Sequence, residues 1–458
     1  MKNCRIIGFV LVFIVGFSVV KAQEKKDSLA ENIDEYLLSA HKFDRFNGSA
    51  LIAEKGRILL QKGYGYKNVA TGVPNDSNTI YQIGSVTKQF TAAVILKLQE
   101  EGKLSVNDKL SKYFPEFTYA DQITLNNLLT HTSGIYNYTN DIDENDSAIV
   151  CNPVSKQLVL DLIFKKNLDF VPGTRFSYDN SGYYLLGLII EKVTGKSYES
   201  EVRDIIFNPL GMNHSFFDFR DAKDTNLATG YKKLNAHEQI IAQRWDSTVT
   251  YAAGGIFSTT GDMYRWATAV ARKTVLSAGS WDAATTPHLE HYGYGWFIDT
   301  IYGERSISHG GGLPGYLADL TYFPDKDATI ILLNNEGYYG EGLTDISASI
   351  AAILFHQPYE LMHVRTEMML PDTVLRKYAG EYVFDKKHHV FITLQNGSLQ
   401  MAAPAGNLPK SPLFPQDEIN FFLKIIDARI EFTFDANKNI TGFVSHYNGK
   451  NEVCKKVK

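Results

Sequence analysis

The sequence predicts an α+β protein with an antiparallel sheet flanked by helices, an inserted helical region, and a small all-β domain at the C-terminal end. Two pairs of strand patterns, one early and one late, enclose a long stretch of helical spacing. After about His356 the pattern changes to short alternating segments separated by turn signals. We therefore expect one domain over residues 29–357 and an all-β domain over 366–458.

The N-terminal segment, residues 1–22, has the pattern of an export signal. Lys2 and Arg5 precede an apolar segment, Ile6–Val20, and Ala22 ends a small-residue cleavage pattern. The apolar segment is short for a bilayer span, although an uncleaved anchor is the alternative. We expect a mature protein that begins near Gln23, is periplasmic or secreted, and keeps no stable membrane span.

The composition is that of an ordinary globular protein. The chain has 458 residues, of which 44% are hydrophobic and 21% charged, with a formal net charge of −5. No basic run stands out, which argues against a nucleic-acid partner. We expect neither a cofactor nor a metal. Cys4 lies in the signal, and the distant Cys151 and Cys454 are expected as free thiols, although an exported protein could bridge them.

The first elements are a helix and a hairpin. Leu29–Phe43 has helical apolar spacing, and the strands Ser49–Ala53 and Ile58–Lys62 flank a turn-prone segment. Helices then dominate, and the spacing places them at Val86–Glu101, Leu125–Leu129, Tyr183–Val193 and Asp262–Ala271.

A second hairpin follows late in the chain. Its strands are Leu317–Phe323 and Ala328–Asn334, and a long helix follows at Leu343–Phe355. Strands at both ends with helices between them predict one antiparallel sheet built from both termini. The segments beyond Leu370 alternate with a period of two and predict a small barrel or sandwich.

The segment "IGSVTKQFTA" raises the question of whether Ser85 is a nucleophile with Lys88 as its base. Ser85 begins a helix, and Lys88 lies on the same face one turn later. In a largely apolar helix the lysine would be desolvated, which lowers its pKa. Ser-x-x-Lys alone is weak evidence, because it also occurs at Ser18–Lys21 and Ser39–Lys42. From this stretch alone a capping serine is the favoured interpretation, and a nucleophile is the alternative.

Two further segments carry polar groups at element boundaries. Tyr178-Asp179-Asn180 enters a strongly apolar helix. His309-Gly310-Gly311-Gly312 precedes the late hairpin, where glycines allow a backbone edge to approach a substrate closely. A flexible turn is the alternative for the glycines. His131, which precedes Ser133 closely, is expected to be structural.

Taken in order, these motifs resemble the serine beta-lactamase and penicillin-binding protein superfamily, in the branch with class C beta-lactamases, D-alanyl-D-alanine carboxypeptidases, D-aminopeptidases and related esterases. The resemblance covers about Leu29 to Phe355. It rests on "IGSVTKQFTA", "LNNLLTHTSGI", "VPGTRFSYDNSGYYLLGLIIEKVTG", "IFNPLGM", "AAGGIFSTTGDMYRW", "YGYGW" and "HGGGLPGY". It implies a beta-lactamase/transpeptidase-like fold for this part of the chain.

The resemblance also implies roles for named residues. Ser85 would attack the substrate carbonyl, Lys88 would take its proton, and Tyr178 would share that proton and pass it to the leaving group. Asn180 would hydrogen-bond the lysine or a substrate amide. The N–H groups of Ser85 and Gly312 would form an oxyanion hole.

Two positions depart from the family pattern. Asp179 stands where serine is common, and we expect a solvated or local structural role for it. His309 stands where penicillin-recognising relatives place a lysine, so we expect it, with Gly311 and Gly312, to form the substrate-binding edge. A histidine with an ordinary pKa would capture a carboxylate weakly and in a pH-dependent way.

The sequence therefore predicts an exported serine hydrolase that forms an acyl-enzyme on Ser85 with small-molecule or peptide substrates, which are amides or esters such as D-amino-acid peptides. The alternatives are a true beta-lactamase and a penicillin-binding sensor without turnover. We expect the all-β domain to restrict access to the cleft or to mediate oligomers, and the sequence leaves the oligomeric state open.

Overall fold

The computed structural model describes residues 28–143, 146–217, 225–235, 238–337, 342–362, 365–384, 388–395, 397–404, 408–424, 426, 428–447 and 450–457. The predicted signal segment, residues 1–22, lies outside the described residues. Among those residues, no helix has both the length and the apolar character needed to cross a membrane.

A six-stranded antiparallel sheet forms the centre of the larger domain. Its strand order is β2-β1-β12-β11-β10-β9, so strands from the two ends of the domain pair directly, as predicted. Gly48 pairs with Asn334 and Glu54 with Ala328. The strands are β1 (Gly48–Glu54), β2 (Arg57–Tyr64), β9 (Phe297–Ile301), β10 (Glu304–Leu313), β11 (Tyr316–Phe323) and β12 (Ala328–Asn334).

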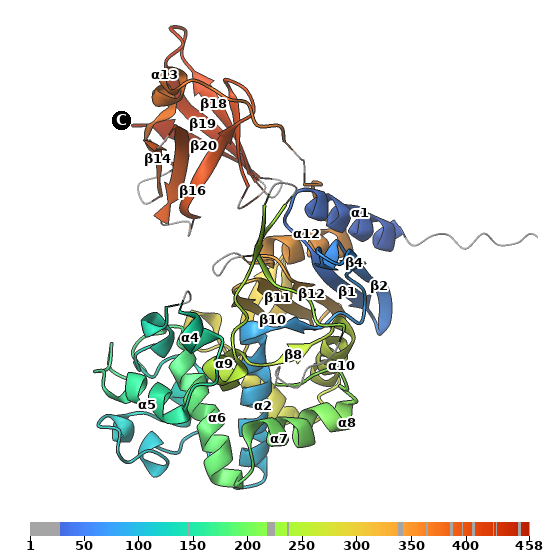
Figure 1. Ribbon diagram of the computed structural model, residues 1–458, viewed down its shortest axis with the longest axis vertical. Helices are drawn as coiled ribbons and strands as arrows, with labels where there is room; N and C mark the ends of the chain where they lie inside the picture. The colour runs from blue at the N-terminus through green and yellow to red at the C-terminus, as the bar shows by residue number, and fades with distance from the viewer. Residues whose placement is uncertain are drawn as a thin grey trace, which may run out of the picture.

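Helices α1 (Ser28–Lys42) and α12 (Thr344–Leu354) cover one face of this sheet (Figure 1). Ile33 and Leu37 of α1 and Ile350 of α12 are fully buried, and they share a core with Ile330 and Leu332 of the sheet. The period-3.6 spacing of the α1 residues is what places them on this face.

The inserted helical region covers the other face of the sheet (Figure 1). Its helices are α2 (Thr87–Glu100), α3 (Leu125–Leu129), α4 (Ser147–Val150), α5 (Lys156–Phe164), α6 (Asn180–Thr194), α7 (Tyr198–Val202), α8 (Asn208–Leu210), α9 (Ser247–Gly254), α10 (Thr260–Ala271) and α11 (Ala278–Ala284). Short strands join them: β3 (Tyr66–Asn68), β4 (Val73–Pro74), β5 (Tyr81–Gln82), β6 (Tyr231–Leu234), β7 (Gln239–Ile241) and β8 (Phe257–Ser258).

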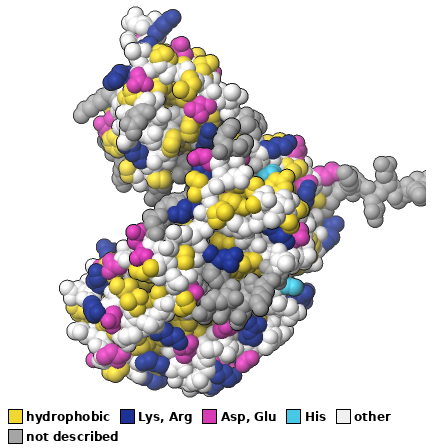
Figure 2. All heavy atoms as spheres, viewed as in Figure 1, with side chains coloured by type: hydrophobic (Ala, Val, Ile, Leu, Met, Phe, Trp, Pro, Cys, Tyr) yellow, Lys and Arg dark blue, Asp and Glu magenta, His cyan; other side chains and the backbone are white. Residues whose placement is uncertain are grey.

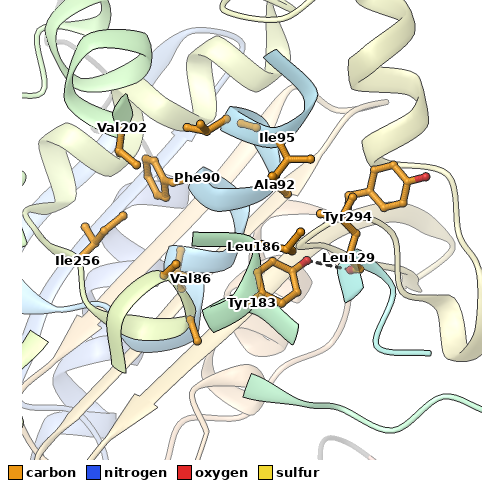
Figure 3. Packing of buried hydrophobic residues seen from close by; sticks show 14 of the residues in the cluster. Val86, Phe90, Ala92, Ile95, Leu129, Tyr183, Leu186, Val202, Ile256 and Tyr294 are labelled. Atoms are coloured by element: carbon orange, nitrogen blue, oxygen red, sulfur yellow. Dashed lines mark hydrogen bonds between the residues drawn. The ribbon is translucent and has the colours of Figure 1, made fainter. Parts of the chain in front are cut away.

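Helix α2 runs through the centre of this region and is buried on nearly all sides. Val86, Phe90 and Ile95 have no exposed surface and pack against residues of α6, α7 and the 252–256 segment (Figure 3). The Phe90 ring stacks on Trp266 with 4.5 Å between the ring centroids. A helix buried on nearly all sides keeps even its polar side chains away from water, and this burial determines the environment of Lys88 on α2.

The C-terminal segment is a closed antiparallel barrel, which confirms the predicted all-β domain. Its strands are β13 (Gly380–Val383), β14 (His389–Gln395), β15 (Ser398–Ala403), β16 (Leu408–Pro415), β17 (Asn420–Leu423), β18 (Ala428–Phe434), β19 (Ile440–Tyr447) and β20 (Lys450–Lys456), preceded by α13 (Asp372–Leu375). The limits proposed for the two domains stay a prediction. Cys454 is buried in the barrel, Cys151 lies in the helical region, and both are free thiols.

The barrel forms a lobe of its own, joined to the larger domain by a narrow junction (Figure 2). On the face shown, basic and acidic side chains are interspersed rather than gathered by sign (Figure 2).

Candidate active site

Ser85 lies in a short helical turn, η1 (Gly84–Val86), which leads directly into α2. Gly84 has a φ of +51°, and a Cβ at this position would lie 2.8 Å from the amide nitrogen of Gly312. Only glycine combines this backbone conformation with so close an approach. The turn therefore brings Ser85 against strand β10.

Lys88 lies one turn further along α2 and is fully buried. Its Nζ donates to Ser85 Oγ at 3.0 Å, to Asn180 Oδ1 at 2.8 Å and to the carbonyl of Ala253 at 2.9 Å. An ammonium has three donors, and these three acceptors hold the lysine beside the serine hydroxyl.

The burial of Lys88 changes its acidity. Removal from water lowers the pKa of Lys88 from its usual 10.5 to about 7, with a smaller opposing effect from the carboxyl of Asp179. A lysine with this pKa is a neutral amine for a large fraction of the time at pH 7. Lys88 can therefore accept the proton of Ser85.

Tyr178 and Asn180 arrive together at the start of α6. The Lys88 Nζ lies 4.8 Å from the centre of the Tyr178 ring. Asn180, besides accepting from Lys88, donates through Nδ2 to Thr139 Oγ1 at 3.2 Å. The structure thus brings together the four residues that the sequence assigned to catalysis, from η1 and α2 and from the residues that lead into α6.

Asp179 is the N-cap of α6, and the expectation of a solvated side chain is wrong for it. It is 4% exposed, and its carboxyl oxygens accept from the N–H groups of Ser181 at 2.7 Å and Gly182 at 2.9 Å. Burial raises the pKa of Asp179 to about 7 against the effect of these hydrogen bonds. The local structural role, which was the other expectation, is the observed one.

His131 is structural, as expected. Its ring is buried, and the centroid of this ring lies 4.3 Å from that of the Tyr178 ring and 4.6 Å from that of the Tyr292 ring. Its Nδ1 accepts from the N–H of Asp179 at 3.1 Å, while Ser133 Oγ accepts from the N–H of Ile135. Since the histidine and Ser133 face different partners, they form no catalytic pair.

His309 differs from the expectation of a histidine that titrates near neutral pH. Its side chain is 2% exposed, with Nδ1 2.6 Å from the carbonyl of Gly310 and Nε2 3.0 Å from the hydroxyl of Tyr292. A carbonyl can only accept, so Nδ1 carries the proton and the Tyr292 hydroxyl donates to Nε2. Burial, with a smaller effect of Lys88, lowers the pKa of His309 to about 3. The neutral, buried imidazole cannot capture a substrate carboxylate.

The glycines after His309 bring β10 against the turn η1, which carries Ser85. A Cβ at Gly311 would lie 2.0 Å from the carbonyl oxygen of Ile83 and 3.2 Å from the amide nitrogen of Ser85. With the contact between Gly84 and Gly312, this places amide nitrogens of the strand beside that of Ser85. Such a pair of N–H groups is what an oxyanion hole requires.

A cavity of about 180 Å³, called the Ser85 cavity below, opens at these groups. Besides Ser85, Asn180 and Gly312, its walls include Thr139, Trp245 and other residues that the sequence reasoning did not assign: Asn137, Tyr138, Asn140, Ile142, Thr250, Ala253, Gly254, Leu313 and Pro314. The described wall holds no Lys, Arg, Asp or Glu.

One segment of this wall contains a residue with a strained backbone conformation. Tyr251, inside α9, has a φ of +41° and a ψ of −129°, which is costly for a residue with a side chain. Two residues later, the Ala253 carbonyl accepts from Lys88, and Ala252 accepts from Thr91 Oγ1 at 2.6 Å. The motif "AAGG" was the sequence signal for this segment, although nothing in it indicated a carbonyl ligand for the lysine.

The family model of the Beta-lactamase family matches residues 39–354. The chain belongs to the Beta-lactamase family. It is a serine hydrolase of the beta-lactamase type. The match spans the sheet and the inserted helices, and it leaves the C-terminal barrel outside.

Two relatives of this Beta-lactamase family protein are similar to it over two thirds or more of its length. Penicillin-binding protein 4* of Bacillus subtilis (strain 168) is 30% identical over 440 residues, which cover 90% of this chain and 96% of the relative. Teichoic acid D-alanine hydrolase of Staphylococcus aureus (strain MRSA252) is 29% identical over 326 residues, 68% of this chain and 75% of the relative.

Solved structures agree on the fold. The octameric penicillin-binding protein homologue from Pyrococcus abyssi has a TM-score of 0.65 and 26% identity, covering 93% of this chain and 99% of that chain. The D-amino acid amidase from Ochrobactrum anthropi SV3 has a TM-score of 0.63 over 72% of this chain and 99% of that chain. At 22% identity, the amidase supports the fold alone.

Proposed function

We propose that this protein is an exported hydrolase that forms an acyl-enzyme on Ser85 and acts on esters or amides of D-amino acids. The observation that carries the proposal is the hydrogen bond of 3.0 Å between the buried Lys88 Nζ and Ser85 Oγ. It joins a hydroxyl to an amine whose pKa burial has lowered to about 7.

In the first step the neutral Lys88 amine accepts the hydroxyl proton while Ser85 Oγ bonds to the substrate carbonyl carbon. The carbonyl oxygen becomes an oxyanion beside the N–H groups of Ser85 and Gly312, each of which would contribute about 3 kcal/mol to lowering the barrier. When the tetrahedral intermediate collapses, the bond to the leaving group breaks. The leaving group takes a proton from Lys88, which can in turn receive one from Tyr178.

In the second step, water replaces the leaving group. The same amine accepts a proton from the water as its oxygen bonds to the acyl carbon, and the ester bond to Ser85 then breaks. Ser85 Oγ recovers its proton from Lys88, and the acid is released. Asn180, which accepts from Lys88 at 2.8 Å, holds the amine in place through both steps.

The walls of the Ser85 cavity favour small acyl groups that carry no carboxylate. Its described residues are uncharged, with polar side chains such as Thr139 and Asn180 and the aromatic Trp245. A substrate with a carboxylate beside the scissile bond finds no cation there, since His309 is buried and neutral. The relatives' names, teichoic acid D-alanine hydrolase among them, support D-alanyl esters in particular.

A substrate panel tests the proposal. We expect turnover of a D-alanyl ester and a D-amino acid amide, and slower turnover of a penicillin-type lactam and of a stem peptide that ends in D-Ala-D-Ala. Ser85→Ala should remove turnover of every substrate. Retention of full activity by this variant would overturn the proposal.

A time course with the substrate in excess over the enzyme separates the hydrolase from a penicillin-binding sensor. Repeated turnover of the D-alanyl ester supports the hydrolase, whereas one stoichiometric burst followed by a stable acyl-enzyme supports the sensor. Export is tested separately, by sequencing the N-terminus of the mature protein, which we expect to begin near Gln23.

A further inference from the structure

One residue, His131, forms hydrogen bonds with both chain neighbours of Tyr178. The N–H of Ser177 donates to the carbonyl of His131 at 2.9 Å, and the N–H of Asp179 donates to its Nδ1 at 3.1 Å. Residues 175–179 belong to no helix or strand. The position of Tyr178 therefore depends on contacts with other parts of the chain, and His131 supplies such contacts on both sides of it.

The ring of His131 also packs on the ring of Tyr178. The centroids of the two rings lie 4.3 Å apart, and the angle between the ring planes is 38°. The Lys88 Nζ lies 4.8 Å from the centre of the same Tyr178 ring. His131 therefore holds the phenol, by its backbone and by its ring, beside the amine of Lys88.

His131 is itself fixed by its place directly after α3. Its φ is +57°, in the left-handed region, where histidine is enriched among residues with a side chain. The N–H of the next residue, Thr132, donates to the carbonyl of Asn127 at 2.9 Å. The hydroxyl of Tyr183 on α6 donates to the carbonyl of Leu129 at 2.8 Å (Figure 3). These bonds keep the end of α3, and His131 with it, in a constant place relative to α6.

The hydrogen bond from Asp179 determines which nitrogen of His131 carries the proton. A nitrogen that accepts from an N–H is not protonated, so Nδ1 is the acceptor and Nε2 carries the hydrogen of the neutral ring. Burial, with smaller effects of Lys88 and His309, lowers the pKa of His131 well below its usual 6.5. The ring therefore stays neutral near pH 7 and keeps this acceptor.

The opposite nitrogen indicates that packing alone does not account for a histidine here. Nε2 is buried and has no hydrogen-bond partner among the residues that the structure describes. An unpaired buried donor costs free energy. A phenylalanine would fill a similar volume among the rings of Tyr178, Tyr183 and Tyr292 without that cost. What histidine adds is the Nδ1 acceptor for the segment of Tyr178.

We propose that His131 is the positioning residue of Tyr178 and holds the phenol where it shares a proton with Lys88; this rests on the proposed function. The proton that Ser85 loses is shared by Lys88 and Tyr178, and the leaving group takes it as the bond to the carbonyl carbon breaks. The described wall of the Ser85 cavity does not include His131, so this residue acts through Tyr178. Its contribution should therefore depend on how much the leaving group needs a proton.

Two substrates with the same acyl group test this dependence on the full chain. D-Alanine p-nitroanilide and D-alanine p-nitrophenyl ester have leaving groups of nearly equal shape. The anilide nitrogen must take a proton as its bond breaks, whereas p-nitrophenolate leaves as a stable anion. The measured quantity is kcat/KM, because it compares the transition state with free enzyme and free substrate.

Three variants of His131 separate its acceptor from its ring. His131→Phe keeps a ring and removes the acceptor, and His131→Gly removes both but accepts the φ of +57° without strain. His131→Asn keeps an acceptor at the δ position of the side chain, and asparagine also tolerates this φ. The control is Thr132→Val in the next residue, which is buried and whose Oγ1 accepts from Asn127 Nδ2 at 3.1 Å.

We expect His131→Phe and His131→Gly to lower kcat/KM about 30-fold for the anilide and by less than about threefold for the ester. His131→Asn should stay within about threefold of wild type, and Thr132→Val within about twofold, on both substrates. Equal losses on the two substrates in the variants without an acceptor would overturn the proposal. So would a loss on the anilide in His131→Asn as large as theirs, since either result is that of a purely structural residue.

Hydrogen exchange tests the same contact without turnover. The amide of Asp179 should exchange slowly in wild type, because its N–H is bound to His131 Nδ1. A peptide that covers residues 175–180, analysed by mass spectrometry, should exchange faster in His131→Phe and His131→Gly and at the wild-type rate in His131→Asn. Unchanged exchange in both variants without an acceptor would overturn the proposal.

Kinetics of Tyr178→Phe distinguish this proposal from the proposed function. We expect this variant to lose activity on the anilide much more than on the ester, as His131→Phe does. Equal rates for Tyr178→Phe and wild type on the anilide, or no turnover by wild type, would count against the proposed function itself. Loss of activity in Tyr178→Phe with none in the variants of His131 would overturn the role of His131 alone.

Discussion

The hydroxyl of Tyr292 donates to Nε2 of His309 across 3.0 Å, inside the protein and away from the Ser85 cavity. The other imidazole nitrogen donates to the carbonyl of Gly310. Both nitrogens are therefore committed to the protein, and the imidazole holds β10 in place. The position at which the sequence led us to expect carboxylate capture is part of the core.

His309→Lys tests this relationship. An ammonium at this buried site would lack the acceptors it needs, so we expect the free energy of unfolding to fall by roughly 3 kcal/mol. His309→Gln, which can still accept from Tyr292 and donate to Gly310, should lose less. Denaturant unfolding of both variants makes the measurement. A stable His309→Lys protein with increased activity on carboxylate-bearing substrates would restore the expectation based on the sequence.

The activity should depend on pH through Lys88. In the proposed mechanism the neutral amine is the base, and the pKa of Lys88 is about 7. We therefore expect kcat/KM for a D-alanyl ester to rise with pH through this value and to level off about one unit above it. A pH–rate profile of wild type checks this, and a profile that is flat or falls over the same range would contradict the role of Lys88 as base.

Asp179→Asn should move this profile to lower pH. The Asp179 carboxylate raises the pKa of Lys88, so its removal lowers that pKa, while asparagine still caps α6. Asp262→Asn is a matched control, because Asp262 is a buried carboxyl on a different helix, α10. An unmoved profile for Asp179→Asn would show that the two groups are not coupled.

The same variant changes how stability depends on pH. The pKa of Asp179 is raised to about 7 in the folded protein, so between its usual 3.8 and 7 the folded state binds the proton more tightly than the unfolded state. The contribution of Asp179 to the free energy of unfolding therefore falls as pH rises from 3.8 to about 7. Thermal unfolding from pH 4 to 8 should show a smaller decline for Asp179→Asn than for wild type.

Gly311→Ala should damage the oxyanion hole. A Cβ there would lie 2.0 Å from the Ile83 carbonyl, so β10 must move away from Ser85, and we expect kcat to fall about 100-fold. The neighbouring Gly310→Ala is the control, since its Cβ would approach no closer than 3.8 Å to Ala318 O. Similar rates for the two variants would show that this edge does not stabilise the transition state.

Local patterns in the sequence were enough for the regular elements. The helix at Leu125–Leu129 has the predicted limits, and β12 is Ala328–Asn334 as expected. Apolar periodicity determines such elements, because each one must bury a single face or stripe. The sheet built from both ends and the all-β C-terminal domain followed from the order of these elements.

The proximity of the proposed catalytic residues was predictable for a different reason. Ser85 and Lys88 lie one helical turn apart, so their proximity is local. Tyr178 and Asn180 were predicted from the ordered series of family motifs. This series replaces the three-dimensional information that spacing in the sequence does not supply for distant residues. The carbonyl of Ala253 had no such signal, since any residue type can present a backbone oxygen.

The sequence by itself determined which side chains we propose for the chemistry, because a nucleophile and its base need particular residue types at a short spacing. Only the tertiary structure decided their charge states and surroundings. Burial lowers the pKa of Lys88 and turns His309 into a neutral core residue, and desolvation depends on chain segments far apart in sequence.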